Sequence, residues 1–163
     1  MIRGRFEGLP GRRRPYVTAH LTIPSQNISG QVSFLVDTGA DSIVLAPTDA
    51  LFLGIDTASL EQGVPSRGIG GTTPTVSTAA TLTLNNRAFN IALRILAPRS
   101  RQQQRALRTI PSLLGRDVLS HLPCLSRSAP TGSFSLNLKK LTPSISLNFS
   151  LSTPTQVSPA PQP

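Results

Sequence analysis

Alternation of apolar and polar side chains, the period-two pattern of a half-buried β-strand, restricts the fold of this chain more than any other feature. It runs through residues 16–23 and 88–96, and residues 76–84 are also strand-like. Two asparagines at 85–86 separate the last two segments, which predicts a β-hairpin. Residues 31–36 end in three consecutive apolar residues, as in a strand buried on both faces. We therefore predict an all-β domain.

Helical segments are expected to be few and short. Pro47 begins a stretch of one or two helical turns that Gly54 closes. Residues 116–122 have the spacing of a brief helix that Pro123 ends. Residues 97–109 are polar and rich in arginine and glutamine, which favours a surface loop.

The length of 163 residues fits one domain. Residues 1–14 are basic and carry little periodicity, so we expect a flexible basic arm. Residues 15–138 form the expected folded domain. Residues 139–163 are a C-terminal extension, and the four prolines near its end predict disorder there. Segments 133–138 and 144–151 are strand-like.

The net charge of +9 comes almost wholly from arginine. One cluster includes Arg12, Arg13 and Arg14, and a second lies within residues 94–108. Because such clusters can bind phosphate backbones, a nucleic-acid partner held through Arg12, Arg13 and Arg14 is one interpretation. A solvated basic surface is favoured, since no aromatic residues interleave with the arginines for base stacking.

Cysteine and histidine are too scarce for a metal site or for nucleophilic catalysis. Cys124 is the only cysteine, and His20 and His121 have no supporting partners in the sequence. No metal or other cofactor is therefore expected. No apolar run has the length of a signal peptide or a membrane span, so we expect a cytoplasmic protein without membrane contact.

The strand at 31–36 leads directly into Asp37-Thr38-Gly39. An aspartate at the end of a buried strand is a costly position for a charge unless it has partners or a chemical task. Glycine two positions later lets the backbone approach a ligand closely. Asp37 is therefore the candidate catalytic residue.

Three motifs, in order, resemble those of retroviral-type aspartic proteases, the retropepsin-like family. Residues 34–42 resemble the active-site segment, residues 68–71 resemble the glycine-rich tip of the flap, and residues 113–117 resemble the segment that leads into the family's helix. The resemblance implies a closed, mostly antiparallel β-barrel with one short C-terminal helix. It also implies a two-fold homodimer that hydrolyses extended polypeptides.

The resemblance assigns roles to particular residues. The two Asp37 carboxylates of the homodimer would share a proton and activate a water molecule that attacks the peptide bond. Thr38 and Gly39 would support this site, Thr38 by a hydrogen bond across the two-fold axis. The substrate-binding residues would be Ala40, Asp41, Gly68, Ile69, Gly70 and Gly71. Arg116 would form a structural ion pair with Asp41, and for Asp41 a structural role and a substrate contact both remain open.

The chain offers no second catalytic aspartate of its own. The other Asp-Thr pair, Asp56-Thr57, is followed by alanine and lies too near Asp37 in the sequence to belong to a second lobe. We interpret Asp56 as a solvated surface acid. A homodimer supplies the missing carboxylate by symmetry.

Apolar side chains are expected to line the substrate pockets, and the candidates are Leu35, Val44, Ile69, Leu96 and Ile110. Either 133–138 or 144–151 would build the dimer interface. Two rivals to an aspartic endopeptidase stay open: a catalytically inactive retropepsin-like module that binds peptides or only dimerises, and a nucleic-acid-binding protein that uses the arginine clusters.

Overall fold

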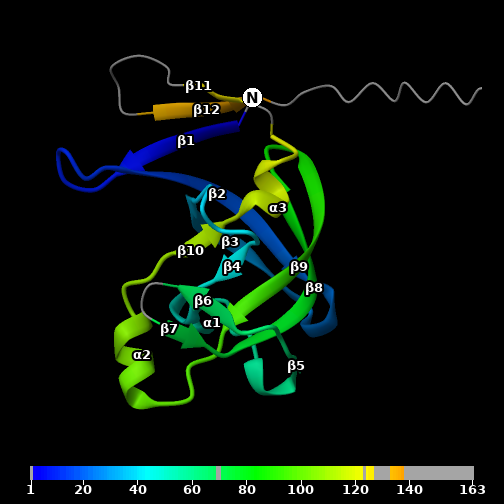
Figure 1. Ribbon diagram of the computed structural model, residues 1–163. Coiled ribbons are helices and arrows are strands. Elements are labelled where there is room, and N and C mark those ends of the chain that lie inside the picture. The colour runs from blue at the N-terminus through cyan, green and yellow to red at the C-terminus, as the bar shows by residue number, and fades with distance from the viewer. Residues whose placement is uncertain (1, 69–70, 123, 127–132, 138–163) are drawn as a thin grey trace, which may run out of the picture.

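The computed structural model describes residues 2–68, 71–122, 124–126 and 133–137, most of them in β-strands (Figure 1). The strands are β1 (Ile2–Glu7), β2 (Arg14–Ile23), β3 (Ile28–Val36), β4 (Val44–Leu45), β5 (Glu61–Gln62), β6 (Ser66–Gly68), β7 (Gly71–Thr73), β8 (Thr75–Leu84), β9 (Arg87–Leu96), β10 (Ser112–Leu114), β11 (Cys124–Ser126) and β12 (Ser133–Asn137). The helices are α1 (Pro47–Phe52), α2 (Arg101–Leu107) and α3 (Arg116–Leu119), with 3-10 turns at Pro24–Gln26 and Thr57–Ser59.

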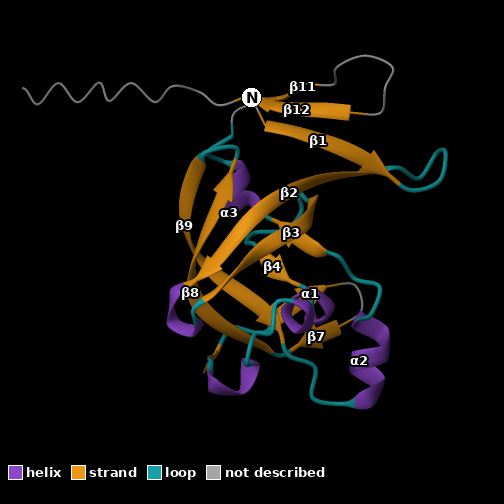
Figure 2. Ribbon diagram, turned by 180° about the vertical axis from the view of Figure 1, so that it is seen from behind, coloured by secondary structure: helices purple, strands orange, loops and turns teal. Residues whose placement is uncertain are grey.

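Six strands close into a barrel in the order β2, β3, β10, β4, β9 and β8 (Figure 2). The barrel closes because β8 pairs with β2 as well as with β9. Most neighbouring strands are antiparallel, whereas the β3–β10 and β4–β9 pairs are parallel. The prediction of an all-β, closed and mostly antiparallel fold is confirmed.

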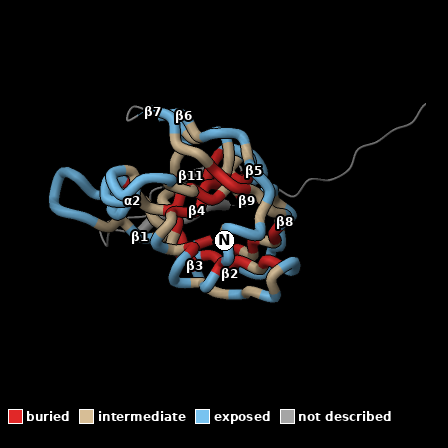
Figure 3. The backbone as a smooth tube through the Cα atoms, turned by 90° about the horizontal axis from the view of Figure 1, so that it is seen from below, coloured by how far each residue is buried: buried red, intermediate tan, exposed pale blue. Residues whose placement is uncertain are grey.

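The inside of the barrel is the hydrophobic core, and the strands around it carry most of the buried residues (Figure 3). The apolar positions of the alternating segments are the ones that point inward. They include Val17, Ala19, Leu21 and Ile23 of β2, Leu82 and Leu84 of β8, and Leu93 and Ile95 of β9. Burying each large aliphatic side chain contributes about 1.5–3 kcal/mol, so the period-two pattern determines which face of each strand is inside.

The hairpin predicted at 76–96 is confirmed. Strands β8 and β9 pair antiparallel from Thr75 opposite Leu96 to Leu84 opposite Arg87. Asn85 and Asn86 both have positive φ, 45° and 67°, as a two-residue hairpin turn with the twist of the strands requires.

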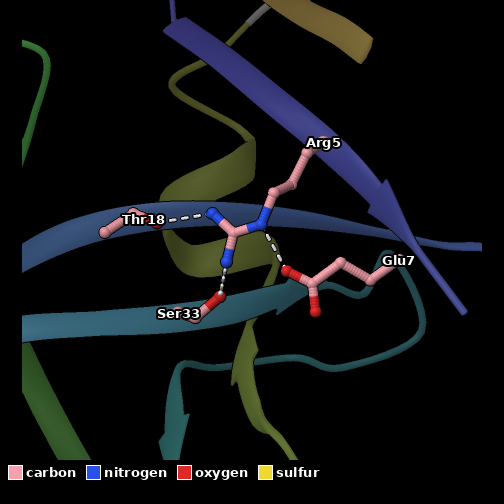
Figure 4. A network of polar contacts seen from close by, with 4 residues as sticks. All are labelled: Arg5, Glu7, Thr18 and Ser33. Carbon is pink, nitrogen blue, oxygen red and sulfur yellow. Dashed lines mark hydrogen bonds and ion pairs between the residues drawn. The ribbon is translucent and has the colours of Figure 1, made fainter. Parts of the chain in front are cut away.

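Residues 2–7 differ from the expected flexible arm. They form β1, which pairs with β2 on one side and β12 on the other. The Arg5 guanidinium fixes β1 to the barrel: it donates to Thr18 Oγ1 at 3.1 Å and Ser33 Oγ at 3.3 Å, and forms an ion pair with Glu7 (Figure 4). Ile2 is buried, so the strand contributes to the core as well.

The surface loop expected at 97–109 instead contains α2. Ser100 caps its first turn by accepting a hydrogen bond from the Gln103 N–H at 3.1 Å. The helix is built from arginine, glutamine, alanine and leucine, all good helix formers, and Leu107 is buried against the barrel. The segment was predicted to be a loop because most of its residues are polar, and the capping serine and the helix formers were given too little weight.

The two candidate interface segments have different outcomes. Residues 133–137 form β12, which lies between β1 and β11 (Figure 1). Residue 138, the segment 144–151 and the rest of the extension lie outside the described residues. Among the helices of the described part of the chain, none is both long and apolar enough to span a membrane.

Candidate active site

Asp37 is the first residue after β3, at the point where this strand separates from its parallel neighbour β10. Its N–H still donates to Leu114 O at 3.1 Å, which continues the strand pairing. The chain then turns sharply: the Gly39 N–H donates to Asp37 Oδ1 at 2.9 Å and the Ala40 N–H donates to Asp37 O at 3.3 Å. The turn holds one carboxylate oxygen and leaves Oδ2 with no hydrogen bond to a described residue.

The turn after Asp37 is connected to α3 by side chains and backbone. Arg116 forms an ion pair with Asp41, as the family resemblance implies. Both side chains are largely exposed. The Arg116 N–H donates to Ala40 O at 2.9 Å and the Asp117 N–H donates to Asp41 O at 3.2 Å. Asp117 in turn accepts from the Ile43 N–H at 2.9 Å. These contacts fix residues 40–43 against the start of α3.

Gly115 lets the two segments approach this closely. A Cβ on this buried glycine would lie 2.4 Å from the carbonyl carbon of Ser42 and 2.5 Å from its oxygen. Both atoms belong to the backbone and cannot turn away. Glycine is therefore required at position 115 for packing reasons.

These observations agree with the comparison to known proteins. The family model for aspartyl proteases matches residues 25–118, more than half of the chain. The chain belongs to the aspartyl protease family. Its fold is similar to a retropepsin-like aspartic protease from Rickettsia conorii, with a TM-score of 0.54 and 20% identity over 83% of this chain and 89% of that one.

A second solved structure, EIAV protease in complex with an inhibitor, matches with a TM-score of 0.48 and 23% identity, covering 70% of this chain and 92% of that one. No curated protein gives a significant match. The predicted resemblance to retropepsin-like aspartic proteases is confirmed.

The aspartyl protease chain uses its other acidic residues mainly in contacts that stabilise the fold. Asp49 accepts from the buried Ser112 hydroxyl, and Asp56 caps the 3-10 turn Thr57–Ser59 by accepting from the Ala58 N–H at 3.0 Å. Asp41 and Asp117 are engaged around α3, Glu7 pairs with Arg5, and Glu61 is exposed in β5. Among the described aspartates, Asp37 is the one that directly follows a barrel strand, and its Oδ2 has no hydrogen bond to a described residue.

Replacing Ser112 with alanine should destabilise the fold by about 2 kcal/mol, measured by urea denaturation. The Ser112 Oγ accepts from the Ala46 N–H at 2.9 Å and donates to Asp49, so its loss leaves the residue before α1 and the first turn of α1 each without this partner. Ser120→Ala, at an exposed position, is the control and should change stability by less than about 0.5 kcal/mol. Equal stability of the two variants would contradict this account.

The glycine-rich segment expected to be a flap forms a separate two-stranded antiparallel hairpin of β6 and β7. Gly68 pairs with Gly71 at its outer end. Ile69 and Gly70, which connect these two residues, lie outside the described part of the chain. The predicted flap residues are therefore described only at Gly68 and Gly71, both exposed.

Three of the candidate pocket residues come together in a small apolar cluster. Val44, Leu96 and Ile110 pack with Leu107 and Leu113. Leu113 pairs with Leu35 on one side and Val44 on the other, so the cluster borders the strand that ends at Asp37. Leu107 was missed from the sequence because α2 was not recognised, although Ser100 and the helix formers after it were the signal.

Neither histidine has a hydrogen bond or ring contact with Asp37 or with the other histidine in the described part of the chain. The His20 ring is 2.6 Å from Ser29 Oγ, and the His121 ring lies near Phe89, with 6.3 Å between centroids. Across the described ranges, no three His, Cys, Asp or Glu side chains are grouped in a way that could hold a metal ion.

Proposed function

We propose that this chain is an aspartic endopeptidase that works as a homodimer, with one active site formed by the Asp37 residues of two subunits. The observation that carries the proposal is the state of Asp37: its turn holds Oδ1 through the Gly39 N–H, and Oδ2 has no bond to a described residue. Aspartic protease chemistry needs two such carboxylates about 3 Å apart. Since the other described aspartates have other partners, a second copy of the chain is the source of the second carboxylate.

The reaction needs no covalent intermediate with the enzyme. One Asp37 carboxylate takes a proton from a water molecule, and the oxygen of that water attacks the carbonyl carbon of the peptide bond. The protonated Asp37 of the other subunit donates a hydrogen bond to the carbonyl oxygen as negative charge develops there. Proton transfer to the leaving nitrogen then breaks the C–N bond, and the two carboxyl groups are left sharing one proton.

The residues around Asp37 fit supporting roles in such a dimer. Thr38 and Gly39 are exposed in the single chain, so they are free to meet a second subunit. Thr38 would donate or accept a hydrogen bond across the axis and hold the two carboxylates in one plane. The β6–β7 hairpin would cover the substrate, and Ala40 and Asp41 would contact its main chain.

The terminal sheet is the proposed second part of the dimer interface. Strand β12 is paired on both sides, whereas β11 is at the end of the sheet and pairs with no second strand among the described residues. An open strand edge is a ready site for pairing with another chain. A partner's terminal strands would close it without disturbing the barrel.

Mixing wild-type chain with Asp37→Asn chain tests the shared active site. If both Asp37 residues are required, only wild-type homodimers cleave. At a constant total concentration and a 1:1 ratio, random pairing leaves about one quarter of the wild-type activity. The mixture is equilibrated and then assayed on an unstructured protein substrate at mildly acid pH.

A monomeric active site would instead retain one half of the activity in this mixture, and that result would overturn the homodimer. A pure wild-type dimer that cleaves nothing over a broad pH range, its own ends included, would support the inactive module. The Asp56→Asn chain is the matched control, because mixing it with wild type should leave the activity unchanged.

A further inference from the structure

The arginines of α2 share one face of the helix. Arg101, Arg105 and Arg108 are separated by four and three residues, the spacing that places side chains above one another on a helix. All three are exposed, whereas Leu107 anchors a different side to the barrel. The ion pairs in the described part of the chain are Arg5–Glu7 and Arg116–Asp41, so none involves this face.

Nothing in the local sequence balances this charge. Residues 97–111 contain no aspartate or glutamate. Like charges one helical turn apart repel each other, and a positive charge in the first turn, where Arg101 lies, opposes the helix dipole. Arg105 and Arg108 lie at the C-terminal end of the helix, where the dipole favours positive charge. The helix therefore tolerates the three charges, and an anionic partner outside the chain would relieve their mutual repulsion.

Helix α2 lies against the apolar cluster that contains three of the candidate pocket residues. Leu107 packs on Val44 and Leu96, in the cluster that borders the strand ending at Asp37. On its other side, Arg99 Nη2 donates to Gln62 Oε1 at 2.9 Å, which connects the start of α2 to the strand before the β6–β7 hairpin. In Figure 1, α2 and this hairpin lie at the same end of the barrel, away from β1 and β12. The exposed Arg67 of β6 adds a further positive charge there.

We propose that the face formed by Arg101, Arg105 and Arg108 selects polypeptide substrates with acidic side chains within a few residues of the cleaved bond. The inference rests on the proposed function, since it assigns a substrate class to the proposed active site. A peptide fits this surface better than a single-stranded nucleic acid, because neither α2 nor strands β6 and β7, the elements that carry this charge, contain a Phe, Tyr or Trp on which bases could stack.

The test uses a peptide that the wild-type enzyme cleaves, chosen from a library, in two versions that differ only in carrying Glu or Gln at the flanking positions. Wild type should cleave the Glu version with a kcat/KM about tenfold higher at low salt, and added salt should reduce the difference. The variant Arg101→Gln/Arg105→Gln/Arg108→Gln should cleave both versions alike. Its activity on the Gln version should equal that of wild type, which also shows that the variant is folded.

The control Arg12→Gln/Arg13→Gln/Arg87→Gln removes the same number of charges at exposed positions outside α2 and the hairpin. It should keep the preference for Glu. The inference is overturned if the α2 variant still prefers the Glu peptide, or if the control loses the preference to the same extent. It is also overturned if an oligonucleotide binds through this face while the wild-type enzyme shows no preference for the Glu peptide.

Two further outcomes separate this inference from the proposed function. Equal cleavage of both peptides by wild type refutes the acidic substrate class and leaves the endopeptidase standing. Failure of wild type to cleave any library peptide refutes both.

Discussion

Replacing Asp37 with asparagine should reduce peptide-bond cleavage by at least about 10³-fold while the fold and the dimer persist. An amide cannot take a proton from water or share one with the partner carboxyl group. The substitution keeps the shape of the side chain, and Asn Oδ1 can still accept the Gly39 N–H that Asp37 accepts at 2.9 Å. Cleavage of an unstructured protein at mildly acid pH measures activity, and light scattering measures the dimer.

Asp56→Asn is the control for this variant, because it makes the same chemical change at the other Asp-Thr pair. Asp56 is exposed and caps a 3-10 turn through the Ala58 N–H, and asparagine caps such turns about as well. Full activity is expected. Retained cleavage by the Asp37→Asn variant would remove Asp37 from the catalytic role.

Gly115→Ala should destabilise the protein by roughly 3 kcal/mol or more and lower cleavage in parallel. The added Cβ would lie 2.4 Å from the Ser42 carbonyl carbon, so residues 40–43 and the start of α3 would have to separate. That separation breaks the backbone hydrogen bond from Arg116 to Ala40, close to Asp37. Urea denaturation at one fixed protein concentration measures the loss, since dimer stability depends on concentration.

Gly68→Ala provides the comparison for stability. A Cβ at this exposed glycine meets no atom within 4 Å and its φ is ordinary, so stability should change by less than about 0.5 kcal/mol. A Gly115→Ala protein as stable as Gly68→Ala would show that the close approach at Ser42 relaxes without cost.

Local periodicity explains how much of the fold could be predicted. The inward residues of β2 and the hairpin of β8 and β9 follow from alternation and from two asparagines that tolerate positive φ. The strand β1 alternates as well, with Ile2, Gly4 and Phe6 on one face, but the arginines between them gave the appearance of a solvated arm. Its pairing with β12 joins opposite ends of the chain, and no local signal encodes such a contact.

The same distinction between local motifs and long-range contacts holds for the candidate site. The order of the three motifs predicts that Asp37, the hairpin glycines and Arg116 belong to one site, because each motif is a short run of adjacent residues. The packing of α2 could not be predicted, since Leu107 joins the apolar cluster only when the helix packs on Val44 and Leu96.

The sequence by itself determined the β class of this protein and its aspartic protease motifs, and it is the basis for proposing that a partner supplies the second aspartate. Tertiary structure alone decided that β8 closes the barrel on β2, that β1 belongs to the fold, that Gly115 lies against Ser42 and that α2 packs on Val44 and Leu96. The physical reason is the sequence separation over which each kind of interaction acts. Side-chain periodicity and turn chemistry act over a few residues, whereas barrel closure and close backbone contacts depend on segments far apart in the chain.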